Sequence, residues 1–150
     1  MDIIIIKPHH FMDIIKLYGF GIDVFVPDEK MHHDFYRFAN AIIQNPHIKL
    51  QLIKDGDDIC QPCIHYHHHC LDSITHISSI VSKETYNQLL DQRIIDLYAL
   101  HQAYYSAYQL CQIFYQNHEL IFKIWQEEDY DITQQRHDYF VVGAKKYIQK

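Results

Sequence analysis

The segment from residue 57 to residue 70 constrains the fold most, because it carries the pattern of a metal-binding loop. Three of the four cysteines, Cys60, Cys63 and Cys70, lie there with the spacing C-x2-C-x6-C. Four histidines stand between the second and third of these cysteines, at positions 65, 67, 68 and 69. Thiolates and imidazoles are the ligands that soft and borderline metals prefer. The segment therefore predicts three ligands of a metal site whose fourth ligand lies elsewhere.

Length and composition predict a single globular domain. The chain has 150 residues, of which 48% are hydrophobic and 21% are charged, a balance that supports a buried core. The net charge of -6 argues against a nucleic-acid-binding surface, and no apolar segment has the length of a membrane span. The first residues do not resemble a secretory signal, so we expect a cytoplasmic protein whose thiols stay reduced.

Apolar patterns in the N-terminal half predict a small two-stranded sheet with helices. Residues 3–6 form a β-branched run and residues 48–53 alternate in polarity, so each segment predicts a strand. One helix is predicted from residue 8 to 18, ended by Gly19 and Gly21, and another from residue 27 to 44. The pattern leaves the relative direction of the two strands open.

The C-terminal half is predicted to be mostly helical. Ser82 is placed to cap a helix, and the pattern that follows predicts continuous helical character to Asn117. A last helix is predicted from residue 131 to 148. Cys111 falls within the apolar face, where a small buried hydrophobic residue is a better interpretation than a fourth metal ligand.

These elements together predict one domain of the α+β class. An α/β metal-binding part covers residues 1–75, and a helical part covers residues 82–150. The chain has twelve tyrosines, and those in the C-terminal half favour a packed core or a surface for a protein partner or a homodimer. We expect neither a membrane nor a nucleic acid among the partners.

The start of the first helix holds the main candidates for the fourth ligand. His9 and Asp13 are four residues apart, so they share a face of the predicted helix, and His10 is their neighbour. The loop histidines are a further option, because they are tethered close to the cysteines. Asp57 and Asp58 are expected to shape the turn before Cys60 by accepting backbone hydrogen bonds. A second role for them is to orient a metal-bound imidazole.

Several short motifs resemble those of a known family. They are Pro8-His9-His10, Tyr18-Gly19-Phe20-Gly21, Asn45-Pro46, Asp57-Asp58-Ile59-Cys60, Cys63 and Cys70. Over roughly residues 7–75 the chain resembles the bacterial and archaeal family called domain of unknown function 1284. The resemblance implies binding of an iron–sulfur cluster by the three loop cysteines. The family's His-His-x-x-Cys motif has its cysteine where this chain has Asp13, so the fourth cluster ligand stays open.

Three functions are compatible with these residues. The first is an iron–sulfur protein with a redox or electron-transfer role, in which Asp13, His9 or His10 completes the cluster site. The second is a structural zinc site in a protein-interaction or regulatory module. The third is a metal-dependent enzyme, for which the sequence shows neither a nucleophile paired with a base nor a phosphate-binding loop.

Overall fold

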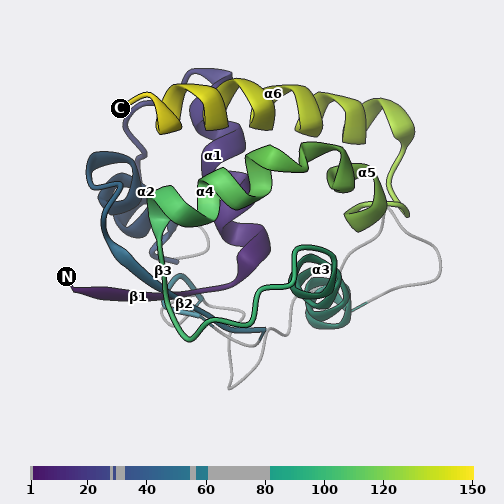
Figure 1. Cartoon of the computed structure of the whole chain (residues 1–150), viewed down its shortest axis with the longest axis horizontal. Helices are drawn as coiled ribbons and strands as arrows, with labels where there is room; N and C mark the ends of the chain where they lie inside the picture. The colour runs from purple at the N-terminus through teal and green to yellow at the C-terminus, as the bar shows by residue number, and fades with distance from the viewer. Residues whose placement is uncertain (1, 28, 30–32, 55–56, 61–81) are drawn as a thin grey trace.

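The computed structural model describes residues 2–27, 29, 33–54, 57–60 and 82–150 (Figure 1). These residues form a small sheet and a set of helices, which confirms the predicted α+β class. In Figure 1, helix α6 (Tyr130–Ile148) crosses one side of the molecule and the sheet lies toward the other. Among the described residues, none of the helices combines the length and the apolar character needed to cross a membrane.

The sheet has three strands in the described part of the chain, in the order β1 (Ile3–Ile6), β2 (Lys49–Leu52) and β3 (Tyr105–Ser106). Strand β1 is parallel to β2, and β3 is antiparallel to β2. The prediction of two strands was therefore wrong in number, because β3 arises in a segment that was predicted to be helical. The parallel pairing places the carboxyl ends of β1 and β2 at the same edge of the sheet.

Helix α1 (Pro8–Phe20) follows β1 directly and packs along α6. It continues through Gly19 to Phe20, two residues beyond the predicted end. Gly21 then adopts a φ of 115°, and its N–H caps the carbonyls of the last turn. The contact between the two helices is close enough to involve backbone atoms. A β-carbon on Gly19 would lie 1.9 Å from the carbonyl oxygen of Tyr139, and one on Gly143 would lie 2.0 Å from that of Ile15.

Helix α2 (Phe35–Gln44) begins later than the sequence predicted. Residue 27 is not helical, and Asp34, immediately before α2, has a φ of -95° and a ψ of 25°. The backbone N–H of Asp34 donates to the carbonyl oxygen of Ile59 over 3.1 Å. The beginning of α2 is thereby fastened to the turn that precedes Cys60.

The predicted continuous helix after Ser82 is interrupted, and that prediction was wrong. Helix α3 (Lys83–Leu97) is capped by the Ser82 hydroxyl as predicted, but it stops where Ala99 adopts a φ of 52°. The N–H of Leu100 then donates to the carbonyl of Ile95, and the N–H of Ala99 donates to that of Asp96. These two bonds form a Schellman motif, in which glycine usually takes the place of Ala99.

The chain then returns to the sheet through β3 and continues into three helical segments. They are α4 (Ala107–Gln116), the 3-10 turn η1 (His118–Leu120) and α5 (Ile121–Ile124). The break expected near Asn117 is confirmed between α4 and η1. Cys111 is fully buried in α4, which confirms its interpretation as a core residue.

Tyr147 on α6 makes a buried hydrogen bond whose contribution to stability we expect to be measurable. Its hydroxyl donates to the carbonyl oxygen of Ile42 over 2.6 Å. The residue four positions after Ile42 is Pro46, which has no N–H to offer that carbonyl. Tyr147→Phe is expected to lower the free energy of unfolding by about 1–3 kcal/mol in urea titration. Tyr130→Phe, which changes an exposed tyrosine of the same helix, should leave it nearly unchanged.

Candidate metal centre

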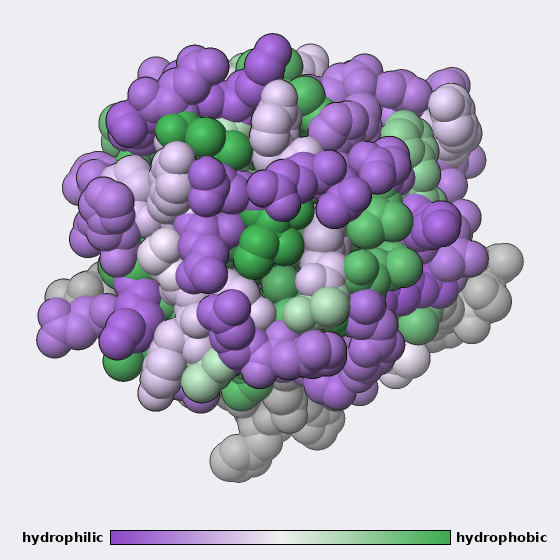
Figure 2. Space-filling model, in the orientation of Figure 1, coloured by the Kyte–Doolittle hydropathy of each residue, from purple (hydrophilic) through white to green (hydrophobic). Residues whose placement is uncertain are grey.

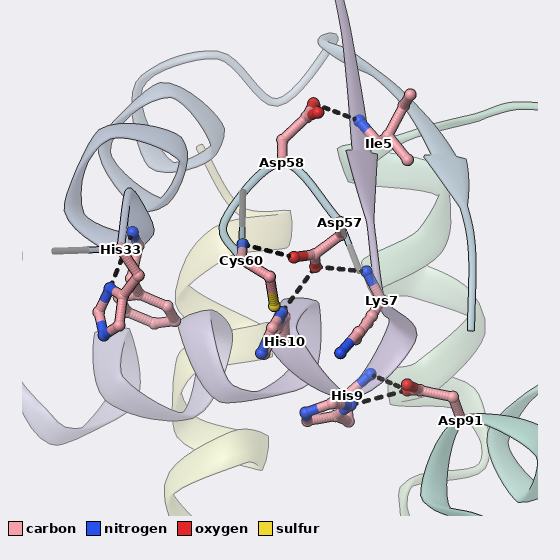
Figure 3. Close-up of polar contacts among 10 residues, drawn as sticks. Ile5, Lys7, His9, His10, His33, Asp57, Asp58, Cys60 and Asp91 are labelled. Carbon is pink, nitrogen blue, oxygen red and sulfur yellow. Dashed lines mark hydrogen bonds and ion pairs between the residues drawn. The ribbon is translucent and has the colours of Figure 1, made fainter. Parts of the chain in front are cut away.

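The candidate site lies where α1 starts and where the segment after β2 returns to β1. The N–H of Asp58 donates to the carbonyl of Ile5 over 3.0 Å, and the Asp58 carboxylate accepts the N–H of Ile5 over 2.8 Å. These bonds hold residues 57–60 beside the end of β1, as Figure 3 shows. Because β1 and β2 are parallel, the first turn of α1 and the turn at 57–60 meet at the same edge of the sheet.

Asp57 is the centre of this arrangement. Its Oδ2 atom accepts hydrogen bonds from the Lys7 backbone N–H at 2.8 Å and from His10 Nδ1 at 2.6 Å. Its Oδ1 atom accepts the Cys60 backbone N–H at 3.1 Å. Burial opposes ionisation of this carboxyl, but His10 and these hydrogen bonds outweigh it and hold the pKa of Asp57 well below its usual range. The predicted role of Asp57 in shaping the turn is confirmed.

Cys60, His10 and Asp57 together could hold a metal ion. One ligand atom from each side chain, a sulfur, an imidazole nitrogen and a carboxylate oxygen, lies within 4.8 Å of the other two. Burial and the neighbouring Asp57 carboxylate raise the pKa of the Cys60 thiol to about 12. Without a metal the thiol is therefore protonated at neutral pH, and a metal ion has to displace that proton to bind the sulfur.

His10 is charged more readily than an ordinary histidine. Burial lowers the pKa of the imidazole, but the charge of Asp57 and the hydrogen bond to it have the larger combined effect and raise the pKa. The same hydrogen bond holds Nδ1 of the ring beside Oδ2 of Asp57. A metal ion bound to both groups would take the place of the shared proton.

His9 is held by a different carboxylate, from helix α3. Its backbone N–H and its Nδ1 atom lie 2.9 Å and 2.8 Å from Oδ1 of Asp91. The rings of His9 and His10 have their centroids 4.4 Å apart. His9 therefore borders the group formed by Cys60, His10 and Asp57. Its backbone nitrogen and its Nδ1 atom, however, pair with Asp91.

Sequence reasoning missed two buried polar residues at this site. Asp91 and Lys7 are both fully buried. A signal for Asp91 was present, because it shares one face of α3 with two other buried polar residues, Glu84 and Asn87, at helical spacing. Lys7 gave no comparable signal, because a lysine before Pro8 is equally compatible with an exposed strand end.

Asp13 occupies a different environment from that of the metal-ligand group. Its carboxylate pairs with Arg136 of α6 and, at 3.7 Å, with Lys16. Burial opposes ionisation, but the Arg136 guanidinium outweighs it and holds the pKa of Asp13 well below its usual range. In the described residues the metal-ligand group therefore includes Cys60 and His10 of the predicted ligands, but neither Asp13 nor His9.

The ion pair of Asp13 predicts a pH-dependent stability. A lowered pKa means that the ionised carboxylate stabilises the fold above the ordinary pKa of 3.8 and that this contribution is lost as the pH falls below it. Asp13→Asn is expected to lower the free energy of unfolding by roughly 1 kcal/mol at neutral pH and by less in acid. Urea titrations of wild type and Asp13→Asn from neutral to acidic pH test this prediction. A difference from wild type that stays constant as the pH falls would contradict the assignment.

Several predicted ligands lie outside the described residues. They are Cys63, Cys70 and the histidines at positions 65, 67, 68 and 69. Their predicted part in the site therefore remains a prediction. Cys60 and Cys111 are the cysteines that the structure describes, and both are free thiols.

No family model, no curated protein and no solved structure matches the chain. The resemblance to domain of unknown function 1284 therefore remains a prediction from the motifs. What the fold and the site define is an α+β protein with a candidate metal centre of mixed sulfur, nitrogen and oxygen ligands.

Proposed function

We propose that this chain binds a single thiophilic divalent metal ion, of which zinc fits best, through Cys60, His10 and Asp57. The observation that carries the proposal is the convergence of the three ligand atoms within 4.8 Å of one another. Zinc accepts thiolate, imidazole and carboxylate ligands together and has no strong preference of its own for geometry. Magnesium and calcium are disfavoured, because both select oxygen ligands.

The position of the site suggests what the ion does for the fold. Residues 57–60 and the first turn of α1 come from distant parts of the sequence and meet through Asp57. A metal bound to Cys60 and His10 would fasten these two segments together and add its binding energy to folding. This role matches a structural or regulatory zinc site better than it matches an enzyme.

A second candidate is an iron–sulfur cluster with a redox or electron-transfer role. The observation that favours it is the C-x2-C-x6-C spacing, which begins at Cys60, the cysteine that reaches the site. Cluster binding would draw on Cys63 and Cys70 in addition. It would then use His10 or Asp57 as a ligand that is not a thiolate.

Anaerobic purification from a medium that supplies both iron and zinc separates the two candidates. Elemental analysis and an absorption spectrum are recorded for wild type, for His10→Gln and for the control His47→Gln, which changes an exposed histidine. A colourless protein with about one zinc per chain, lost only in His10→Gln, supports the zinc site. A brown protein with iron and sulfide supports the cluster. A wild-type protein that retains neither metal contradicts both.

A further inference from the structure

A groove with apolar walls and two cationic side chains lies between α1 and α6. Its volume is about 260 Å³, just below the roughly 300–1,000 Å³ of typical small-molecule sites. Each helix contributes one face to it, through side chains at helical spacing. The described residues that line the groove are Lys16, Leu17 and Phe20 of α1 and Ile132, Gln135, Arg136 and Tyr139 of α6.

The walls of the groove expose apolar surface. Phe20 is 61% exposed and Ile132 is 52% exposed. The rings of Phe20 and Tyr139 pack edge to face with their centroids 5.0 Å apart, so they join the two helices along one wall. Hydrophilic side chains cover much of the face shown in Figure 2. A groove with exposed apolar walls departs from that pattern, and such clusters are typical of binding sites.

The charges at the groove are not balanced. The Asp13 carboxylate pairs with both Lys16 and Arg136, so two cations share one anion. None of the described residues that line the groove is acidic. Burial lowers the pKa of Lys16, and Asp13 does not offset this because Arg136 opposes it. One positive charge is therefore left over at the groove, in a chain whose net charge is -6.

The leftover charge selects the polar part of a ligand. A carboxylate beside Lys16 and Arg136 would accept N–H groups from both and balance the remaining charge. Donors are available, because a guanidinium carries five of them and the bond from Arg136 to Asp13 uses Nη1. The side chains of Lys16 and Arg136 are only 25% and 20% exposed, so water and salt screen them less than at an open surface.

We propose that this groove binds a small carboxylic acid that has an apolar body. The carboxylate lies between Lys16 and Arg136, and the apolar body lies along the wall formed by Phe20 and Tyr139. Binding there does not depend on the proposed metal, because the groove and the metal-ligand group have no residue in common.

Equilibrium dialysis against radiolabelled octanoate tests the groove, with 1-octanol as the uncharged probe of the same chain length. Wild type is expected to bind about one octanoate per chain with saturation, and to bind octanol about tenfold more weakly or less, because the alcohol leaves the cations without an anion. Lys16→Met keeps the apolar stem of the side chain and should weaken octanoate binding by about tenfold. Lys145→Met, which changes an exposed lysine of α6, should bind octanoate like wild type.

Three results would overturn the proposal. The first is the absence of saturable octanoate binding to wild type. The second is binding of octanol as tight as that of octanoate, which points to a purely apolar occupant. The third is equal octanoate affinity in Lys16→Met and wild type, which is also the result expected if octanoate binds at the proposed metal instead. If Lys16→Met does not fold, the comparison of octanoate with octanol on wild type decides.

Discussion

Gly143→Ala is expected to destabilise the protein by more than about 3 kcal/mol, because it forces α1 and α6 apart. The added β-carbon would lie 2.0 Å from the carbonyl oxygen of Ile15 and 2.8 Å from the backbone nitrogen of Gly19. Both contacts are with backbone atoms, which cannot rotate away as a side chain can. The two helices form the most extensive contact between elements in the described residues, so their separation affects the whole core.

Urea titration of Gly143→Ala and of the control Gly21→Ala measures this effect. Gly21 has open space around its position but a φ of 115°, so alanine there should cost only about 1–2 kcal/mol for the left-handed conformation. Within a helix, alanine is favoured over glycine by about 1 kcal/mol, so helix propensity alone would make Gly143→Ala stabilising. A Gly143→Ala protein as stable as wild type would show that α1 and α6 do not approach as closely as described.

Asp57→Asn is the second change for which we expect a large effect. It should lower the free energy of unfolding by about 3–5 kcal/mol at neutral pH. Both carboxylate oxygens of Asp57 accept a backbone N–H, one from Lys7 and one from Cys60. An asparagine amide must direct its NH2 group at one of these donors, in whichever way the amide is turned. The change also removes the negative charge opposite His10, so metal binding should be lost together with stability.

Asp58→Asn is the matched control for Asp57→Asn. The hydrogen bond recorded for the Asp58 side chain is the one that it accepts from the Ile5 N–H, and an asparagine oxygen can accept the same bond. We expect a change in the free energy of unfolding of less than about 1 kcal/mol and full retention of metal. Urea titration measures the free energy of unfolding of both variants, and metal analysis measures how much metal each of them retains. Equal effects at positions 57 and 58 would contradict the central place of Asp57.

Local patterns in the sequence were sufficient for most elements of the fold. The β-branched run of β1, the glycine that ends α1 and the apolar face of α6 each identify their element by residue type and spacing. The exceptions are the start of α2, the strand β3 and the end of α3. At the end of α3, Ala99 takes a conformation that glycine usually supplies. Tertiary contacts explain it, because Leu100 is buried in the core just after the turn.

The site was less predictable than the fold, because its residues are brought together by the direction of the strands. His10 and Cys60 were recognised from their types, and the parallel pairing of β1 and β2 places them at the same edge. Asp13 was favoured by its position in a motif, but Arg136, which is distant in sequence, takes its carboxylate. Lys7 and Asp91 became part of the site only when the positions of β1 and α3 were known.

The metal content of Cys60→Ala and Cys111→Ala tests the central claim most directly. The two variants remove the same group, one from the site and one from the core of α4. After anaerobic purification and removal of loosely bound ions, wild type and Cys111→Ala are expected to retain about one metal ion per chain, and Cys60→Ala to retain almost none. Full metal content in Cys60→Ala, or equal loss in both variants, would contradict a metal centre built on Cys60, His10 and Asp57.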